Sequence, residues 1–205
     1  EPIVIIAAGL VIGGMIIAPL LSRSRGHLRL PWQEFSTVVI GLGHAQPAHH
    51  RVHHHHFQGM HTALRQLRRE GFRRVGFCAP ATVDQRMYGA WSASFLTHHP
   101  LGHRAAAGLL HLPREPQKDA FIEWLERACP EVLLDSARQF IPWLLHLPED
   151  RRPPAATLSW SPEQAGVPGL DQRPAELGRA ALDLLVAQLN RNERGIPACA
   201  KTVMI

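Results

Sequence analysis

Cysteine is scarce in this chain, and no two cysteines have the spacing of a metal-binding motif. The three cysteines, Cys78, Cys129 and Cys199, stand far apart and form no C-x-x-C pair. A sparse, odd set argues against a disulfide framework or a zinc ribbon and suits a reducing compartment. The sequence also lacks a glycine-rich phosphate loop and a recognisable nucleophile–base pair. We therefore expect no catalytic residues and no cofactor.

Positively charged residues are only slightly in excess over negatively charged ones. Lys and Arg number 22 against 17 Asp and Glu, which gives a net charge of +5. Small arginine clusters, such as Arg68 and Arg69 with Arg73 and Arg74, are typical of solvated helix ends rather than of a nucleic-acid site. Hydrophobic residues make up 45% of the 205 residues, so the chain is globular and long enough for one large domain or two small ones.

One long apolar run allows two interpretations. Residues 2–21 carry no charge over a membrane-spanning length and are followed by "SRSR", as in a membrane anchor. Alternatively, Gly13 and Gly14 divide the run, and "GMIIAPL" is a buried parallel strand, because such strands are apolar on both faces. Composition alone leaves both open.

Strands and helices are predicted to alternate along the rest of the chain. Apolar runs predict strands at 37–43, 74–78, 131–135, 156–160 and 201–205, and helical spacing predicts helices at 57–67, 84–97, 117–128, 138–147 and 174–190. This alternation indicates βαβ units and parallel sheets. Ligands bind outside the carboxyl ends of such strands, which selects 41–43, 79–86, 135–136 and 160–161. For each, a surface loop or a helix cap is the alternative.

Three stretches together resemble the effector-binding domain of the LacI/GalR family of transcriptional regulators. They are "MHTALRQLRREGFRRVGFC", "DQRMYGAWSASF" and "GLDQRPAELGRAALDLLVAQLNRNERGIPACAKTVMI". In addition, "GGMIIAPL" is similar to the family's "DGIIxxP" strand, with Gly14 in place of the usual Asp. The resemblance covers nearly the whole chain and favours the strand over the membrane anchor.

The resemblance implies a fold and a division into subdomains. The expected fold is α/β, with two Rossmann-like parallel-sheet subdomains of the type I periplasmic-binding-protein kind and an effector in the cleft between them. Residues 1–56 and 173–205 would form the first subdomain and residues 57–172 the second. The match begins at the family's second strand, so the first βαβ unit, the hinge helix and the helix-turn-helix are expected to be absent from this chain.

The resemblance also implies effector-binding residues. Arg86 matches the family's arginine that hydrogen-bonds the effector, and its planar fork suits paired sugar hydroxyls. Asp135 and Ser136 match a loop whose polar side chains face the cleft. Gln172 falls where a glutamine lines the hinge side, and Gly41 falls near a position that is polar in relatives.

The sequence departs from the family after the next strand, where relatives often carry an Asp pair. Here residues 159–161 read Ser-Trp-Ser, so a hydroxyl acceptor is missing, although Trp160 could stack on a sugar face. Arg86 is expected to open a helix, where a positive charge is unfavourable, which favours a role in ligand binding. The alternative is an ion pair with Asp84 or a solvent-facing side chain.

The stretch "HHRVHHHHFQG", residues 49–59, falls at the expected first crossover. If it is extended, His53 and His55 face one way and His54 and His56 the other, so no face has three ligands. No Cys, Asp or Glu occurs between Phe35 and Glu70. We expect a connector without a metal; incidental metal binding, a pH-sensitive hinge and a functional metal site remain the alternatives.

These observations predict the sugar-sensing module of a LacI-type transcriptional regulator. Its expected partners are a small-molecule effector of the sugar class, a second copy of the chain in a homodimer, and DNA only through the absent helix-turn-helix. It would be cytoplasmic, without membrane contact. The alternatives are a periplasmic-type sugar-binding protein of a transporter and a metal-dependent enzyme built on the histidines.

Overall fold

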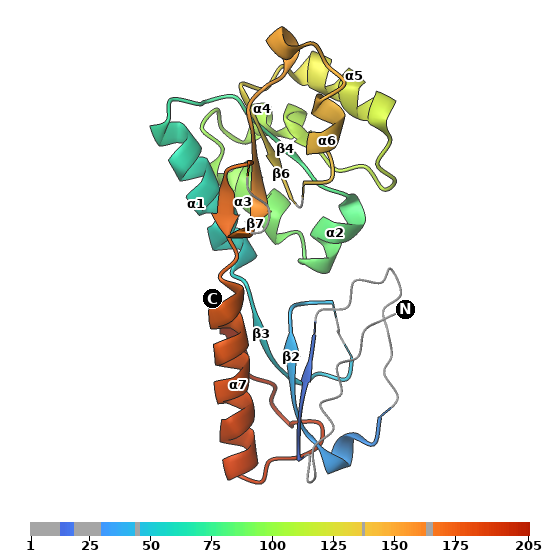
Figure 1. Cartoon of the computed structure of the whole chain (residues 1–205), viewed down its shortest axis with the longest axis vertical. Helices are drawn as coiled ribbons and strands as arrows, with labels where there is room; N and C mark the ends of the chain where they lie inside the picture. Colours follow the sequence, from blue (N-terminus) through green and yellow to red (C-terminus); the bar gives the residue numbers. More distant parts are fainter. Residues whose placement is uncertain (1–12, 19–29, 44–45, 137, 163–165) are drawn as a thin grey trace. The chain divides into compact units, whose positions relative to one another are not determined.

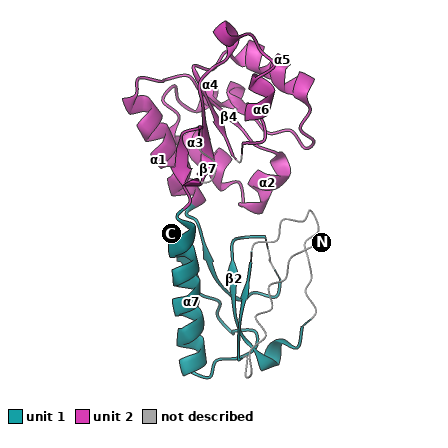
Figure 2. Cartoon of the chain, viewed as in Figure 1, with its two compact units in different colours: residues 1–55, 173–205 teal, residues 56–172 magenta. Residues whose placement is uncertain are grey.

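Two parallel sheets organise the chain in a computed structural model that describes residues 13–18, 30–43, 46–136, 138–162 and 166–205. The chain divides into unit 1, residues 1–55 and 173–205, and unit 2, residues 56–172 (Figure 2). Each unit combines one parallel sheet with helices. The prediction of an α/β fold with two parallel-sheet subdomains is therefore confirmed.

Unit 1 contains a sheet with the strand order β1-β2-β3-β9, in which all neighbouring strands are parallel. Its elements are β1 (Gly14–Ile17), η1 (Trp32–Glu34, a 3-10 helix), β2 (Ser36–Ile40), β3 (His50–His53), α7 (Pro174–Asn190) and β9 (Thr202–Met204) (Figure 1). Helix α7 has the bounds that the sequence predicts, with proline in its first turn. Its buried Leu177, Ala181 and Leu185 recur every four residues and pack in one core with Val38 and Val52 of the sheet.

Unit 2 contains a sheet with the order β5-β4-β6-β7-β8, also with parallel neighbours. Its strands are β4 (Val75–Cys78), β5 (Leu110–His111), β6 (Val132–Asp135), β7 (Ala155–Trp160) and β8 (Gly169–Asp171). Its helices are α1 (His56–Arg69), α2 (Ala81–Arg86), α3 (Ala90–His98), α4 (His103–Gly108), α5 (Lys118–Ala128), α6 (Ile141–Leu144) and the 3-10 helix η2 (Glu149–Arg151).

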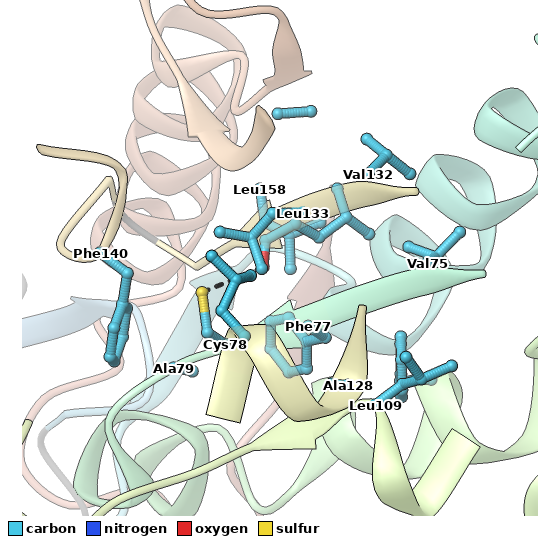
Figure 3. Packing of buried hydrophobic residues seen from close by; sticks show 14 of the residues in the cluster. Val75, Phe77, Cys78, Ala79, Leu109, Ala128, Val132, Leu133, Phe140 and Leu158 are labelled. Carbon is cyan, nitrogen blue, oxygen red and sulfur yellow. Dashed lines mark hydrogen bonds between the residues drawn. The ribbon is translucent and has the colours of Figure 1, made fainter. Parts of the chain in front are cut away.

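The core of unit 2 forms because its central strands are apolar on both faces. Phe77 of β4, Leu133 of β6 and Leu158 of β7 have no exposed surface, and they pack in one cluster (Figure 3). In the same cluster, the Cys78 thiol donates a hydrogen bond to the carbonyl oxygen of Leu134 at 3.4 Å. Burial raises the pKa of this thiol, so Cys78 is a core residue and not a nucleophile.

The predicted helix at 84–97 is wrong, because the chain forms two helices there. Helix α2 ends at Arg86 and α3 begins at Ala90. Between them Tyr88 and Gly89 have φ values of +55° and +69°, which an α-helix does not permit. The Asp84 carboxylate accepts hydrogen bonds from the backbone N–H of Ser92 at 3.2 Å and from its hydroxyl at 2.6 Å, and these bonds stabilise the break.

Two further expectations differ from the structure. The helix predicted at 138–147 is only the single turn α6, with Pro142 near its start. The histidine stretch is not extended throughout, because β3 ends at His53 and His56 is the first residue of α1. The predicted alternation of faces over 53–56 therefore fails at His56.

The apolar run at residues 2–21 lies largely outside the described residues. Its described part contains β1, which confirms the strand expected from "GMIIAPL". Within the described ranges, no helix combines the length and the apolar character needed to cross a membrane.

Candidate functional site

The strand order of unit 2 reverses at one place, between β4 and β6. From β4 the chain passes to β5 on one side and then returns across β4 to β6, β7 and β8 on the other. Parallel α/β sheets bind ligands outside the carboxyl ends of the strands at such a switch. Here these ends are Cys78 and Asp135, which lie opposite each other in register. We name the segments that follow them, residues 79–86 and 135–136, the switch edge.

Asp135 and Ser136 follow β6 at this edge but differ in their bonding. The fully buried Asp135 accepts hydrogen bonds through Oδ2 from the backbone N–H groups of Phe140 at 2.6 Å and Ile141 at 3.0 Å. The carboxylate is thus engaged by its own loop, and its contact with an effector stays a prediction. Ser136 donates its backbone N–H to the Cys78 carbonyl oxygen at 3.1 Å, while its buried Oγ has no hydrogen-bond partner.

Arg86 is the last residue of α2, not the first residue of a helix as expected. A positive charge is favourable at a helix C-terminus, so that part of the argument for a ligand role is wrong. A different observation replaces it: the Arg86 Nε is buried and has no hydrogen-bond partner. The alternative ion pair with Asp84 is absent among the described residues, and the Asp84 carboxylate accepts its hydrogen bonds from Ser92.

Trp160 and Gln172 lie at the same carboxyl edge of the sheet, on strands farther from the switch. Trp160 is the last residue of β7 and is partly exposed. Gln172 directly follows β8, and its Nε2 donates a hydrogen bond to the Leu158 carbonyl oxygen, which ties the end of β8 to β7. One donor of the Gln172 side-chain amide is therefore already used by a hydrogen bond within the sheet.

Gly41 is separate from these residues, because it follows β2 in unit 1. Its φ of +85° lies in the left-handed region that favours glycine. Its N–H donates to the Val52 carbonyl oxygen at 2.8 Å. The local backbone thus explains this glycine, and its role toward an effector stays a prediction.

The sequence interpretation missed His111, at the carboxyl end of β5. His111 lies opposite Cys78 in register, and its ring stacks on Trp124 with 4.9 Å between the ring centres. Its Nε2 is buried without a hydrogen-bond partner, and burial lowers its pKa. A two-residue strand is too short for an apolar pattern, so no signal in the sequence placed this histidine.

The histidines in β3 and directly after it make separate contacts within unit 1. His50 accepts a hydrogen bond at Nδ1 from the Lys201 backbone N–H at 2.8 Å, and its Nε2 lies 3.6 Å from Glu193 Oε1. Burial lowers the pKa of His50 although Glu193 opposes this, and burial also lowers the pKa values of His53 and His54. In the described part of the chain, no three His, Cys, Asp or Glu residues are placed to hold a metal ion.

Comparisons with known proteins identify the fold. No protein-family model matches the sequence, and no curated protein matches it. A ribose operon repressor from Burkholderia thailandensis has a similar structure, with a TM-score of 0.62 and 19% identity over 95% of this chain and 75% of that chain. A LacI-family regulatory protein from Chloroflexus aggregans gives a TM-score of 0.60 and 16% identity over 94% and 73%.

A third similar structure contains a sugar. The transcriptional regulator CelR, in complex with cellobiose, has a TM-score of 0.55 and 19% identity over 94% of this chain and 63% of its own. These similar structures are transcriptional regulators, which are not enzymes. The chain therefore has the two-subdomain α/β fold of LacI-family transcriptional regulators.

Proposed function

We propose that this chain is the sugar-sensing module of a LacI-type transcriptional regulator and binds its effector at the switch edge of unit 2. One observation carries the proposal: Arg86 Nε and Ser136 Oγ are buried at this edge without hydrogen-bond partners. A buried polar group without a partner is costly, and a bound ligand can supply what is missing. The fold of regulators, one of which binds cellobiose, supports a sugar as the effector class.

The wider assembly is part of the proposal. The module acts as a homodimer in the cytoplasm, and sequence-specific contact with DNA is made through a separate helix-turn-helix part rather than through units 1 and 2. Trp160 and Gln172 complete the binding edge in unit 2, and a role of Gly41 of unit 1 toward the effector stays a prediction. The effector is bound and released without chemical change.

Thermal unfolding with a panel of sugars tests the proposal. The panel contains neutral mono- and disaccharides including cellobiose, together with sugar acids and sugar phosphates. A bound effector raises Tm, because it stabilises only the folded chain. Arg86→Ala should weaken effector binding by about 1.5–3 kcal/mol, the range for hydrogen bonds to charged groups, and should leave the Tm of the free chain nearly unchanged.

Two variants sharpen this test. Arg86→Lys should also weaken binding, because lysine lacks the planar fork. Arg114→Ala should not, because Arg114 is exposed beyond β5. The proposal is contradicted if no member of the panel raises Tm, or if Arg86→Ala binds the effector as tightly as the parent chain.

A further inference from the structure

We infer that the effector carries a negatively charged oxygen group, as a sugar acid or a sugar phosphate does. The inference rests on the proposed function, because it concerns the ligand of the same switch edge. It goes further by naming the chemical class that the unsatisfied groups of this edge require.

The unsatisfied groups at the switch edge call for a hydrogen-bond acceptor. Arg86 Nε carries an N–H and can only donate, and Ser136 Oγ can donate its proton. The backbone N–H of Ser136 is already used by the Cys78 carbonyl oxygen. Ligand oxygens that accept from these two side chains would satisfy this part of the edge.

The carboxylates at the switch edge are engaged by their own chain. Asp84 accepts two hydrogen bonds from Ser92, and Asp135 accepts two backbone hydrogen bonds in the loop after β6. At the end of β7, residues 159–161 contain no acidic side chain. Asp171, at the end of β8, is exposed and already has an interaction partner.

Arg86 itself is not paired directly with a carboxylate of the described residues, although Asp84 and Asp135 belong to the same edge. No ion pair to Arg86 occurs among the described residues, and Arg138 adds a second guanidinium in the loop after β6, although Arg138 has a partner of its own. A partly buried charge without a counter-charge is unfavourable.

The chemistry of the ligand follows from the missing hydrogen-bond acceptor and from the missing counter-charge of Arg86. The hydroxyl groups of a neutral sugar would accept from Arg86 but would leave its charge unpaired. A carboxylate or a phosphate group accepts two hydrogen bonds from the guanidinium fork and also neutralises it. A further oxygen of the same ligand can accept from Ser136. An anionic effector therefore satisfies the edge more completely than its neutral parent sugar.

Calorimetric titration of the full chain tests this with matched compounds. Glucose, galactose and ribose are each compared as the neutral sugar, the sugar acid and the phosphate ester. We expect the tightest ligand to be an acid or a phosphate that binds at least about tenfold more tightly than its neutral parent. The acid and the phosphate arms then show which oxyanion the site prefers.

Variants assign the preference to Arg86. Arg86→Gln removes the charge but keeps a polar side chain, and it should reduce the anion preference to within about threefold of parity. Arg86→Lys keeps the charge and should keep most of the preference, even where overall affinity falls. Ser136→Ala should weaken anion binding, while Arg114→Gln, at an exposed arginine of the same sheet edge, should leave the preference unchanged.

The outcomes separate this inference from the proposed function. A neutral sugar that binds as tightly as its acid and phosphate, and loses affinity in Arg86→Gln, overturns the anionic class but leaves the sugar-sensing module intact. An anion preference that persists in Arg86→Gln overturns the assignment to this arginine. Binding of none of the nine compounds overturns this inference, whereas the proposed function is overturned only if no member of the wider panel, cellobiose included, raises Tm.

Discussion

The loop after β6 depends on one buried carboxylate. Asp135 receives two backbone hydrogen bonds, so Asp135→Ala removes both and leaves the N–H groups of Phe140 and Ile141 without an acceptor. We expect the free energy of unfolding to fall by about 1.5–3 kcal/mol. Urea denaturation measures this. Asp150→Ala, at an exposed position of η2, should change stability by less than about 0.5 kcal/mol, and equal effects of the two variants would contradict the prediction.

A buried histidine makes the stability of unit 2 sensitive to pH. His99 Nε2 lies 3.0 Å from the Val75 carbonyl oxygen, and its Nδ1 accepts from the Leu101 backbone N–H at 3.2 Å. Both nitrogens are therefore used by the neutral ring, and burial lowers the pKa of His99. The unfolded chain then binds more protons than the folded chain as the pH falls.

The free energy of unfolding should accordingly decrease as the pH falls below about 6.5, the ordinary histidine pKa, and level off below the lower folded pKa. His99→Gln should be less stable at neutral pH but should show a shallower dependence on pH over this range. His103→Gln, at an exposed position in α4, should retain the parent slope. Denaturation curves at several pH values distinguish these results, and an unchanged slope in His99→Gln would refute the role of this ring.

Single residues show how far the sequence could predict the site. The strand-end rule places Arg86, Asp135 and Ser136 at one edge of unit 2, because strand ends can be read from apolar runs. It could not show that Asp135 is engaged by its own loop. Nor could it place Arg86 at the end of a helix, because the break in the chain depends on bonds between Asp84 and Ser92.

Two glycines in different elements should respond to alanine in opposite directions. Gly178 lies within α7, and an added Cβ would meet no atom within 4 Å, so Gly178→Ala should stabilise the chain by about 0.5–1 kcal/mol. At Gly169 of β8 the Cβ would lie 2.5 Å from the backbone oxygen of Thr157, so Gly169→Ala should destabilise by about 1–3 kcal/mol. Thermal and urea unfolding compare both with the parent chain. A stability change of the same sign in both variants would contradict the expectation.

Among the elements, those with a long and regular pattern were predictable. Helices α5 and α7 bury one face at helical spacing, so their bounds follow from the sequence to within a residue. Strands β5 and β8 contain only two and three residues, and β8 is largely exposed. Their place is set by pairing with β4 and β7, which local sequence does not encode.

At the scale of the whole molecule, the modest net charge predicts how the chain interacts with DNA. The net charge is +5, and the exposed Arg65, Arg68, Arg69 and Arg73 lie at the end of α1 and in the turn that follows. We expect this chain to bind duplex DNA only without sequence preference. Such binding should be lost between about 50 and 200 mM salt, because it depends on counterion release. A sequence-selective gel shift that survives the higher salt would contradict this.

Unit 1 is assembled from two segments that leave the ribosome at different times. Strand β3 pairs with β9 through Arg51 and Thr202, and the Ser36 hydroxyl donates to the Glu193 carbonyl oxygen at 2.7 Å. Unit 2 is continuous in sequence and is synthesised between these segments, so it can close its sheet first. At about 5–20 residues per second, the apolar strands β1 and β2 wait on the order of 10 s for their covering helix. That interval is when the nascent chain is most exposed to aggregation and has the greatest need of a chaperone.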